Sequence, residues 1–200
     1  MIKQAVYSVF LLLALASPLS AQAGNPRGTS MPPEFTWSMD EPVIRAQIIA
    51  GMVELRPAEI PGQSVLNATV TWISNALNLP AIYGHPRVER APKIKLTLAL
   101  HGSQFVSKNS VLSGYDDAKQ TIYLPDDWSA STPEGMSILI HEMVHHLQNV
   151  AGLQYGCPQE REKLAYVAQQ QWLTSFGRSL EKNFGMDPIT YLQSTECYIP

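Results

Sequence analysis

The stretch ILIHEMVHHLQNV, residues 138–150, holds three of the five histidines of this chain. Its residues His141, Glu142 and His145 match the pattern H-E-x-x-H, which places two histidines one helical turn apart. On a helix such residues share one face, with Cβ atoms roughly 5–6 Å apart, so both imidazoles can bind one metal ion. A charged glutamate inside an apolar helix is costly unless it has a partner. The stretch therefore predicts a metal site on a helix.

Zinc is the ion that this spacing favours. Two imidazoles bind Zn²⁺ at about 2.0–2.1 Å, and zinc lowers the pKa of a water that it holds towards about 7. Glu142 is rotated by about 100° from His141, so it can take a proton from this water without binding the metal. The alternative is a surface helix with scattered histidines. We place His146 in this second class, because it points about 100° away from His145.

The third metal ligand is predicted to be a downstream carboxylate. The metzincin pattern requires Gly at 148 and His at 151, where this chain has Gln148 and Ala151. No histidine follows His146, and the upstream His85 and His101 have no motif around them.

Helical phase separates the two candidate carboxylates, Glu160 and Glu162. At 100° per residue, Glu160 falls on the side that carries Lys163. Glu162 lies in the stripe expected to face the core, so it is the favoured ligand. The alternative for Glu162 is a buried ion pair with Arg161 or Arg178. The stripe that Glu162 shares consists of Ala165, Tyr166, Gln169, Leu173 and Phe176.

The order of elements along the chain predicts an α+β fold. A hydroxyl cap at Thr132, followed by Pro133, begins the helix that carries the histidines, and Gly152 ends it. Alternation over residues 93–100 predicts a strand with one buried face. The remaining pattern predicts a short antiparallel sheet between helices, within one α+β domain. The predicted helices are 42–56, 64–79, 132–150, 158–176 and 179–183, and the second strand is 120–124 after a turn at 116–119.

The N-terminus has the pattern of a secretory signal peptide, residues 1–23. Its apolar run is followed by the small-x-small sequence of a cleavage site, with the cut after Ala23, or alternatively after Ala21. An uncleaved membrane anchor is the alternative, although the run is short for a spanning helix. We expect a flexible segment at 24–41 and a single domain at 42–200.

The charge after removal of residues 1–23 is −4, since that segment carries Lys3 and no acid. No basic run or face is present, so the sequence does not predict nucleic-acid binding. The two cysteines, Cys157 and Cys197, favour one disulfide in an exported chain. Free thiols, or Cys157 as a metal ligand, are the alternatives.

The motifs resemble those of the gluzincins, and most closely small exported bacterial proteins of minigluzincin type. HEMVH at 141–145 is followed after 16 residues by EKLAY at 162–166, and the resemblance covers about residues 94–175. It implies a zincin-like fold with an edge strand at 121–124 beside the cleft. It also implies roles for five residues: zinc ligands His141, His145 and Glu162, the general base Glu142, and Tyr166 as a donor to the developing oxyanion.

Taken together, the sequence predicts an exported zinc metallopeptidase, secreted or periplasmic, that acts on a peptide or protein substrate. It binds one Zn²⁺ and has no stable membrane association after signal cleavage. The alternatives are a zinc-binding protein without turnover and a structural domain that keeps a relic site. Glu142 favours the enzyme over these alternatives, since metal retention needs only His141, His145 and Glu162.

Overall fold

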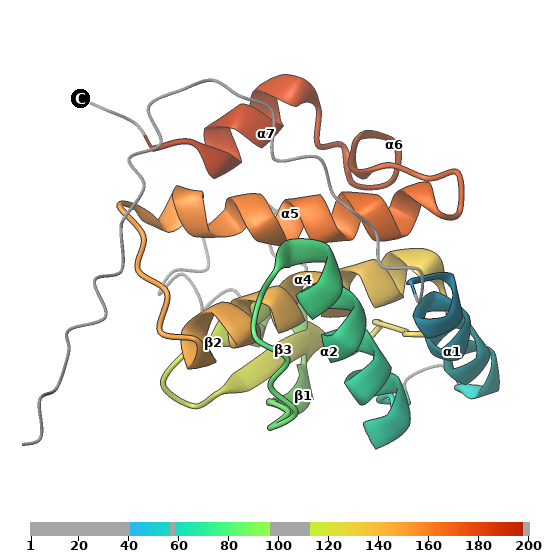
Figure 1. The fold of residues 1–200 in the computed structure, drawn as a ribbon. Helices are drawn as coiled ribbons and strands as arrows, with labels where there is room; N and C mark the ends of the chain where they lie inside the picture. Colours follow the sequence, from blue (N-terminus) through green and yellow to red (C-terminus); the bar gives the residue numbers. More distant parts are fainter. Residues whose placement is uncertain (1–40, 57–58, 97–112, 198–200) are drawn as a thin grey trace, which may run out of the picture. The chain divides into compact units, whose positions relative to one another are not determined.

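The structure is a computed structural model that describes residues 41–56, 59–96 and 113–197. The predicted signal peptide, most of segment 24–41 and His101 therefore lie outside the described residues. The described elements form an α+β arrangement (Figure 1). Their bounds are α1 Glu41–Glu54, α2 Gln63–Leu77, β1 Arg87–Ala91, β2 Gly114–Asp116, β3 Thr121–Pro125, α4 Pro133–Val150, α5 Pro158–Thr174, α6 Leu180–Phe184 and α7 Pro188–Thr195.

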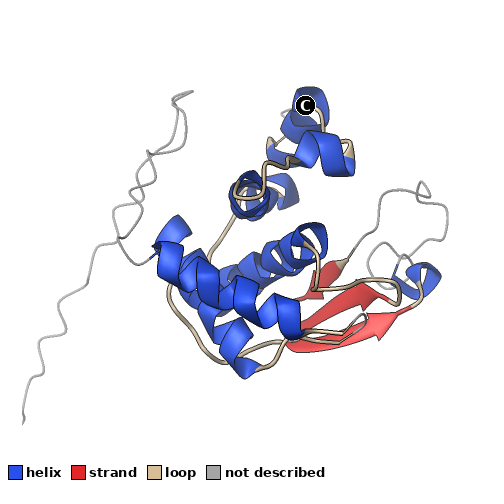
Figure 2. Ribbon diagram, turned by 90° about the vertical axis from the view of Figure 1, so that its right-hand side faces the viewer, coloured by secondary structure: helices blue, strands red, loops and turns tan. Residues whose placement is uncertain are grey.

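The sheet is mixed, so the expected antiparallel sheet is wrong in part. Its strand order is β1-β3-β2, with β1 parallel and β2 antiparallel to β3. Strand β3 is therefore the central strand of the described sheet, and the expectation that 121–124 forms an edge strand is also wrong. The central position agrees with its burial, since Ile122 and Leu124 are fully buried. Strand β2 contacts α4, and Figure 2 shows the three strands in red beside the larger helices in blue.

The strand expected at 93–100 is also wrong over its first half. Residues 93–96 form a single helical turn, in which the amides of Lys95 and Leu96 donate to the carbonyl of Pro92 at 2.8 and 3.2 Å. The strand comes earlier, as β1, and residues 97–100 lie outside the described residues. The alternating pattern misleads here, because the turn buries Leu96 and leaves Ile94 exposed.

Helix α4 forms where the capping pattern predicts it. The Thr132 hydroxyl accepts a hydrogen bond from the amide of Gly135 at 3.0 Å, and Pro133 occupies the first turn. Gly152, just beyond the helix, has a φ of 66°, a conformation that favours glycine. The central residues of α4 are buried, so its histidines lie inside the fold.

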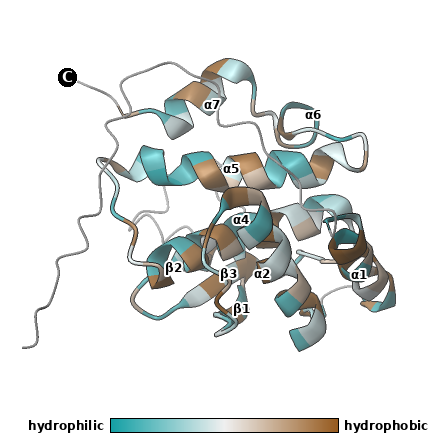
Figure 3. Ribbon diagram, viewed as in Figure 1, coloured by the Kyte–Doolittle hydropathy of each residue, from teal (hydrophilic) through white to brown (hydrophobic). Residues whose placement is uncertain are grey.

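Helix α5 packs along α4 and carries its own start signal, Pro158 after an extended Cys157. The indole of Trp172 donates to the carbonyl of Pro133 at 3.0 Å, and its ring contacts Trp72 of α2 edge-on at 5.9 Å. Hydrophobic and hydrophilic residues alternate along α5 (Figure 3), as expected for a helix with one face against the core.

The C-terminal part is tied to α5 by a disulfide between Cys157 and Cys197, which confirms the predicted pairing. Their Cα atoms lie 5.8 Å apart, and Lys163 of α5 also pairs with Glu196 at 2.9 Å. Helix α7, which the sequence analysis missed, packs on α5. The disulfide excludes Cys157 as a metal ligand and agrees with an oxidising compartment. In the described part of the chain, no helix has the length and hydrophobicity needed to span a membrane.

Candidate metal centre

Three side chains from α4 and α5 converge on one point. His141 Nε2 lies 3.1 Å from Glu162 Oε2, and His145 Nε2 lies 3.3 Å from Glu162 Oε1. The two imidazole Nε2 atoms are 3.2 Å apart. One ligand atom from each residue falls within 4.8 Å of the others. This buried group of two histidines and a carboxylate could hold a metal ion.

A glutamine fixes the orientation of the first imidazole. His141 Nδ1 donates to Gln169 Oε1 at 3.1 Å, and Gln169 Nε2 donates to Ser137 Oγ at 3.2 Å. The Ser137 hydroxyl is itself used as a donor to the carbonyl of Glu134 at 2.7 Å, so it must accept from the amide. These hydrogen bonds orient the side-chain amide of Gln169 with its oxygen towards His141. Nδ1 therefore carries a proton, and Nε2 faces the centre, where it donates to Glu162 when protonated and offers a lone pair to a metal ion when deprotonated.

A second glutamine does the same for His145. His145 Nδ1 donates to Gln148 Oε1 at 2.9 Å, and Gln148 Nε2 donates to the carbonyl of Arg161 at 3.0 Å. Since a carbonyl only accepts, the amide orientation is again determined. Both histidines are therefore held with Nδ1 as a donor to a glutamine and Nε2 towards the centre, which is the arrangement that metal-ligating histidines need.

The charges in this group support one another. Burial disfavours the Glu162 carboxylate, but the hydrogen bonds and charge of His141 and His145 lower its pKa well below the usual range. Burial likewise opposes the charging of His145, yet the hydrogen bond and charge of Glu162, aided by Glu142 and Gln148, raise its pKa. Without a metal, the carboxylate is thus kept ionised by imidazoles. A divalent cation would fit the same donors, because it supplies the positive charge that Glu162 requires.

Glu142 is buried, with 4% of its surface exposed, and does not belong to the three-residue group. Its Oε1 accepts a hydrogen bond from the Ser113 hydroxyl at 2.5 Å. Its negative charge acts on both His145 and Tyr166. The carboxylate of Glu142, which neighbours His141 in the sequence, is thus held by a residue that precedes β2.

Tyr166 lies against the same centre from α5. Its ring centroid is 4.7 Å from that of His141, with the planes inclined at 64°. Burial, reinforced by the negative charges of Glu162 and Glu142, raises the pKa of its hydroxyl. The phenol therefore remains protonated at neutral pH and keeps a hydrogen to donate.

The carboxylate of Glu160 takes no part in this group. The side chain is exposed, and Oε2 accepts from the backbone amide of Gly156 at 2.7 Å. The rotational argument that separated Glu160 from Glu162 thus agrees with the geometry.

The alternative ion pairs of Glu162 do not form either. Arg161 makes a bidentate pair with Asp117 at 2.6 and 2.7 Å, and Arg178 pairs with Glu134. The only ion pairs of Glu162 in the described residues are those with the two histidines.

His146 is fully buried, so its interpretation as a surface histidine is wrong. Its Nε2 donates to the carbonyl of Gly84 at 2.7 Å, and its Nδ1 accepts from the hydroxyl of Tyr115 at 2.9 Å. Burial lowers the pKa of His146. The ring was predicted to point away from His145, and it does, but that direction faces other parts of the fold rather than solvent. Both of its ring nitrogens are thus used in hydrogen bonds within the fold.

Sequence reasoning missed Gln148, Gln169 and Ser113 as functional residues. A signal existed for Gln169, which lies in the same helical stripe as Glu162, and for Gln148, one turn after the second histidine. No local pattern could have found Ser113, because its contact with Glu142 spans 29 positions.

Comparison with known proteins gives one family. The model of the family described as Domain of unknown function (DUF6647) matches residues 59–197, which include every residue of the candidate centre. Neither a curated protein nor a solved structure matches this chain. Since the family model covers more than half of the 200 residues, the chain belongs to the DUF6647 family.

Proposed function

We propose that this protein is an exported zinc-dependent hydrolase of peptide bonds. The observation that carries the proposal is the convergence of His141, His145 and Glu162, with the Glu142 carboxylate close by. Three nitrogen and oxygen donors leave a fourth position of a tetrahedral zinc site open, as in catalytic rather than structural sites. The disulfide supports export, because such bonds persist in oxidising compartments.

The donor set suits zinc and supplies the chemistry of hydrolysis. Zinc bound by these residues would act as a Lewis acid on the carbonyl and lower the pKa of a water. Glu142 accepts a proton as the water oxygen bonds to the carbonyl carbon, and it gives the proton to the amine nitrogen as the C–N bond breaks. The Ser113 hydroxyl fixes the rotamer of Glu142 for this transfer. Tyr166, which stays protonated, donates to the carbonyl oxygen as negative charge develops there.

Metal content is the first test. The purified mature protein should hold about one Zn²⁺ per chain, measured by elemental mass spectrometry, and His141→Ala or His145→Ala should abolish it. His85→Ala is the matched control, because His85 is hydrogen-bonded to Asn67 at 2.6 Å and lies outside the group. A wild-type protein free of metal after zinc-supplemented expression would overturn the proposal.

Turnover is the second test. The wild type should cleave members of a diverse peptide library, whereas Glu142→Gln should keep the zinc and the fold and lose hydrolysis, because it removes proton transfer but no ligand. Mass spectrometry of the library gives the cleaved bonds directly. If wild type and Glu142→Gln retain zinc and are equally inert, the protein binds zinc without turnover.

A further inference from the structure

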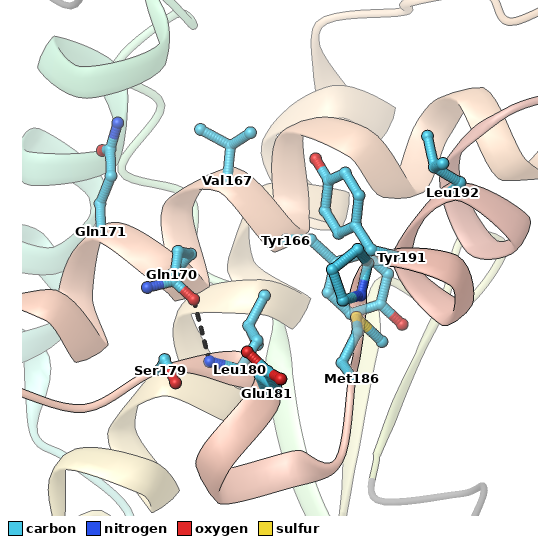
Figure 4. Close-up of a pocket in the computed structure, with 11 residues that line it drawn as sticks. Tyr166, Val167, Gln170, Gln171, Ser179, Leu180, Glu181, Met186, Tyr191 and Leu192 are labelled. Carbon is cyan, nitrogen blue, oxygen red and sulfur yellow. Dashed lines mark hydrogen bonds between the residues drawn. The ribbon is translucent and has the colours of Figure 1, made fainter.

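A pocket of about 570 Å³ lies between α5, α6 and α7 (Figure 4). This volume is within the range of small-ligand sites. The pocket is open on one side, and most of its wall is apolar. This apolar part includes Tyr166, Val167, Leu180, Met186, Tyr191 and Leu192.

Two polar side chains of the wall, Gln170 and Ser179, are already used within the protein. Gln170 Oε1 accepts from the amide of Leu180 at 2.9 Å, shown as the dashed line in Figure 4, and its Nε2 donates to Thr174 at 2.8 Å. The Ser179 hydroxyl caps α6 by accepting from the amide of Lys182 at 3.2 Å. A side chain that enters the pocket therefore meets a mainly hydrophobic surface.

Tyr166 borders both this pocket and the metal centre. Tyr166 belongs to the pocket wall, and its ring contacts both His141 at 4.7 Å and Tyr191 at 6.1 Å between centroids. An extended peptide advances about 3.3–3.6 Å per residue. A substrate with its scissile bond at the metal centre can thus reach the pocket with a side chain only a few residues away.

We propose that the pocket accepts an aliphatic or aromatic side chain of the peptide substrate and so determines specificity. This inference rests on the proposed function and names the substrate class of the same site. The carboxylate of Glu181, which also lines the pocket, disfavours an acidic side chain in it. Burial of a Leu or Phe side chain should raise kcat/KM by roughly 10- to 100-fold over Asp at that substrate position.

The test compares two substitutions on α7. Leu192 lines the pocket and Ile189 does not, yet both are exposed apolar residues, at 56% and 68%. Leu192→Trp should fill part of the pocket and shift the preferred substrate residue from Leu or Phe to smaller side chains. Ile189→Trp should leave the preference unchanged. A cleavage profile of the same peptide library, recorded for all three proteins, measures the shift. Cleavage without an apolar preference, or with a preference that Leu192→Trp does not move, would overturn the inference while the proposed function stands.

A binding measurement that needs no turnover separates the two proposals. N-acetyl-leucinamide, titrated into the zinc-loaded Glu142→Gln protein, should shift the NMR signals of Met186 and Tyr191, and N-acetyl-aspartamide should not. Leu192→Trp in the same background should weaken the leucinamide shifts at least several-fold. If no peptide is cleaved, the proposed function fails and this titration alone decides whether the pocket binds apolar side chains. Equal shifts from both amides, or none, refute the pocket as an apolar subsite.

Discussion

Replacement of Glu162 by alanine is the most informative perturbation of the metal centre. The side chain approaches His141 Nε2 at 3.1 Å and His145 Nε2 at 3.3 Å, so it supplies the only carboxylate of the group. Zinc binding by four protein ligands has an apparent free energy of about 10–16 kcal/mol. One ligand then corresponds to roughly 3 kcal/mol, or about 100-fold in the dissociation constant. We expect Glu162→Ala to weaken zinc binding by at least this factor.

The matched control is Glu160→Ala, which removes the same side chain from the exposed side of α5. Its hydrogen bond with Gly156 is local, so we expect zinc affinity within about three-fold of wild type and a stability change near ±0.5 kcal/mol. Competition against a chelating dye measures the affinity. The reasoning is refuted if Glu160→Ala loses zinc or if Glu162→Ala retains it.

The variant Glu162→Ala also tests the electrostatics of the metal-free protein. In the folded state the pKa of His145 is raised by Glu162 above its usual value near 6.5. This pair therefore stabilises the metal-free fold fully between the usual pKa of Glu162, 4.5, and that of His145, 6.5, and the contribution is lost as the pH rises through the folded pKa of His145. In Glu162→Ala this fall with rising pH should disappear. Urea unfolding of both proteins with a chelator, between pH 5 and 9, measures it; parallel pH profiles would contradict the assignment.

Three further variants test the surroundings of the centre. The double variant Cys157→Ser and Cys197→Ser should lower the free energy of unfolding by about 4 kcal/mol in urea titrations, because the bond closes a 40-residue separation, and should change zinc affinity little. Tyr166→Phe should keep zinc and lower kcat by roughly 100-fold; an unchanged kcat would remove its proposed role. Gln148→Leu should weaken zinc binding by about 10- to 100-fold, because His145 loses the acceptor that fixes its tautomer, and an unaltered affinity in dye competition would refute that function.

The helices of the centre could be predicted because their signals are local. Thr132 and Pro133 define the start of α4, and helical phase alone distinguishes Glu162 from Glu160. Helix α7 carried a similar signal, since Asp187 caps it at 2.7 Å and Pro188 follows, but the sequence analysis predicted no helix after residue 183.

The sheet and the residues that contact α4 could not be predicted from local sequence signals. The parallel pairing of β1 with β3 aligns Arg87 with Thr121, and no local pattern encodes a pairing over that distance. For His146, phase gave the direction of the ring, but its partner at Gly84 comes from a loop 62 positions away. Such contacts depend on how the elements pack, which periodicity within one helix does not describe.

The guanidinium of Arg161 has a consequence for the order of events during maturation. It joins α5 to the turn before β3 through Asp117 and to α4 through the carbonyl of His145 at 3.2 Å. Both contacts fix the rotation of the helix that carries the neighbouring Glu162, and neither involves a metal. Small zinc modules, by contrast, are unfolded until the ion arrives. We therefore expect this chain to fold first and to bind zinc afterwards. A chelator should then remove the ion, and added zinc should restore it, while the protein stays folded.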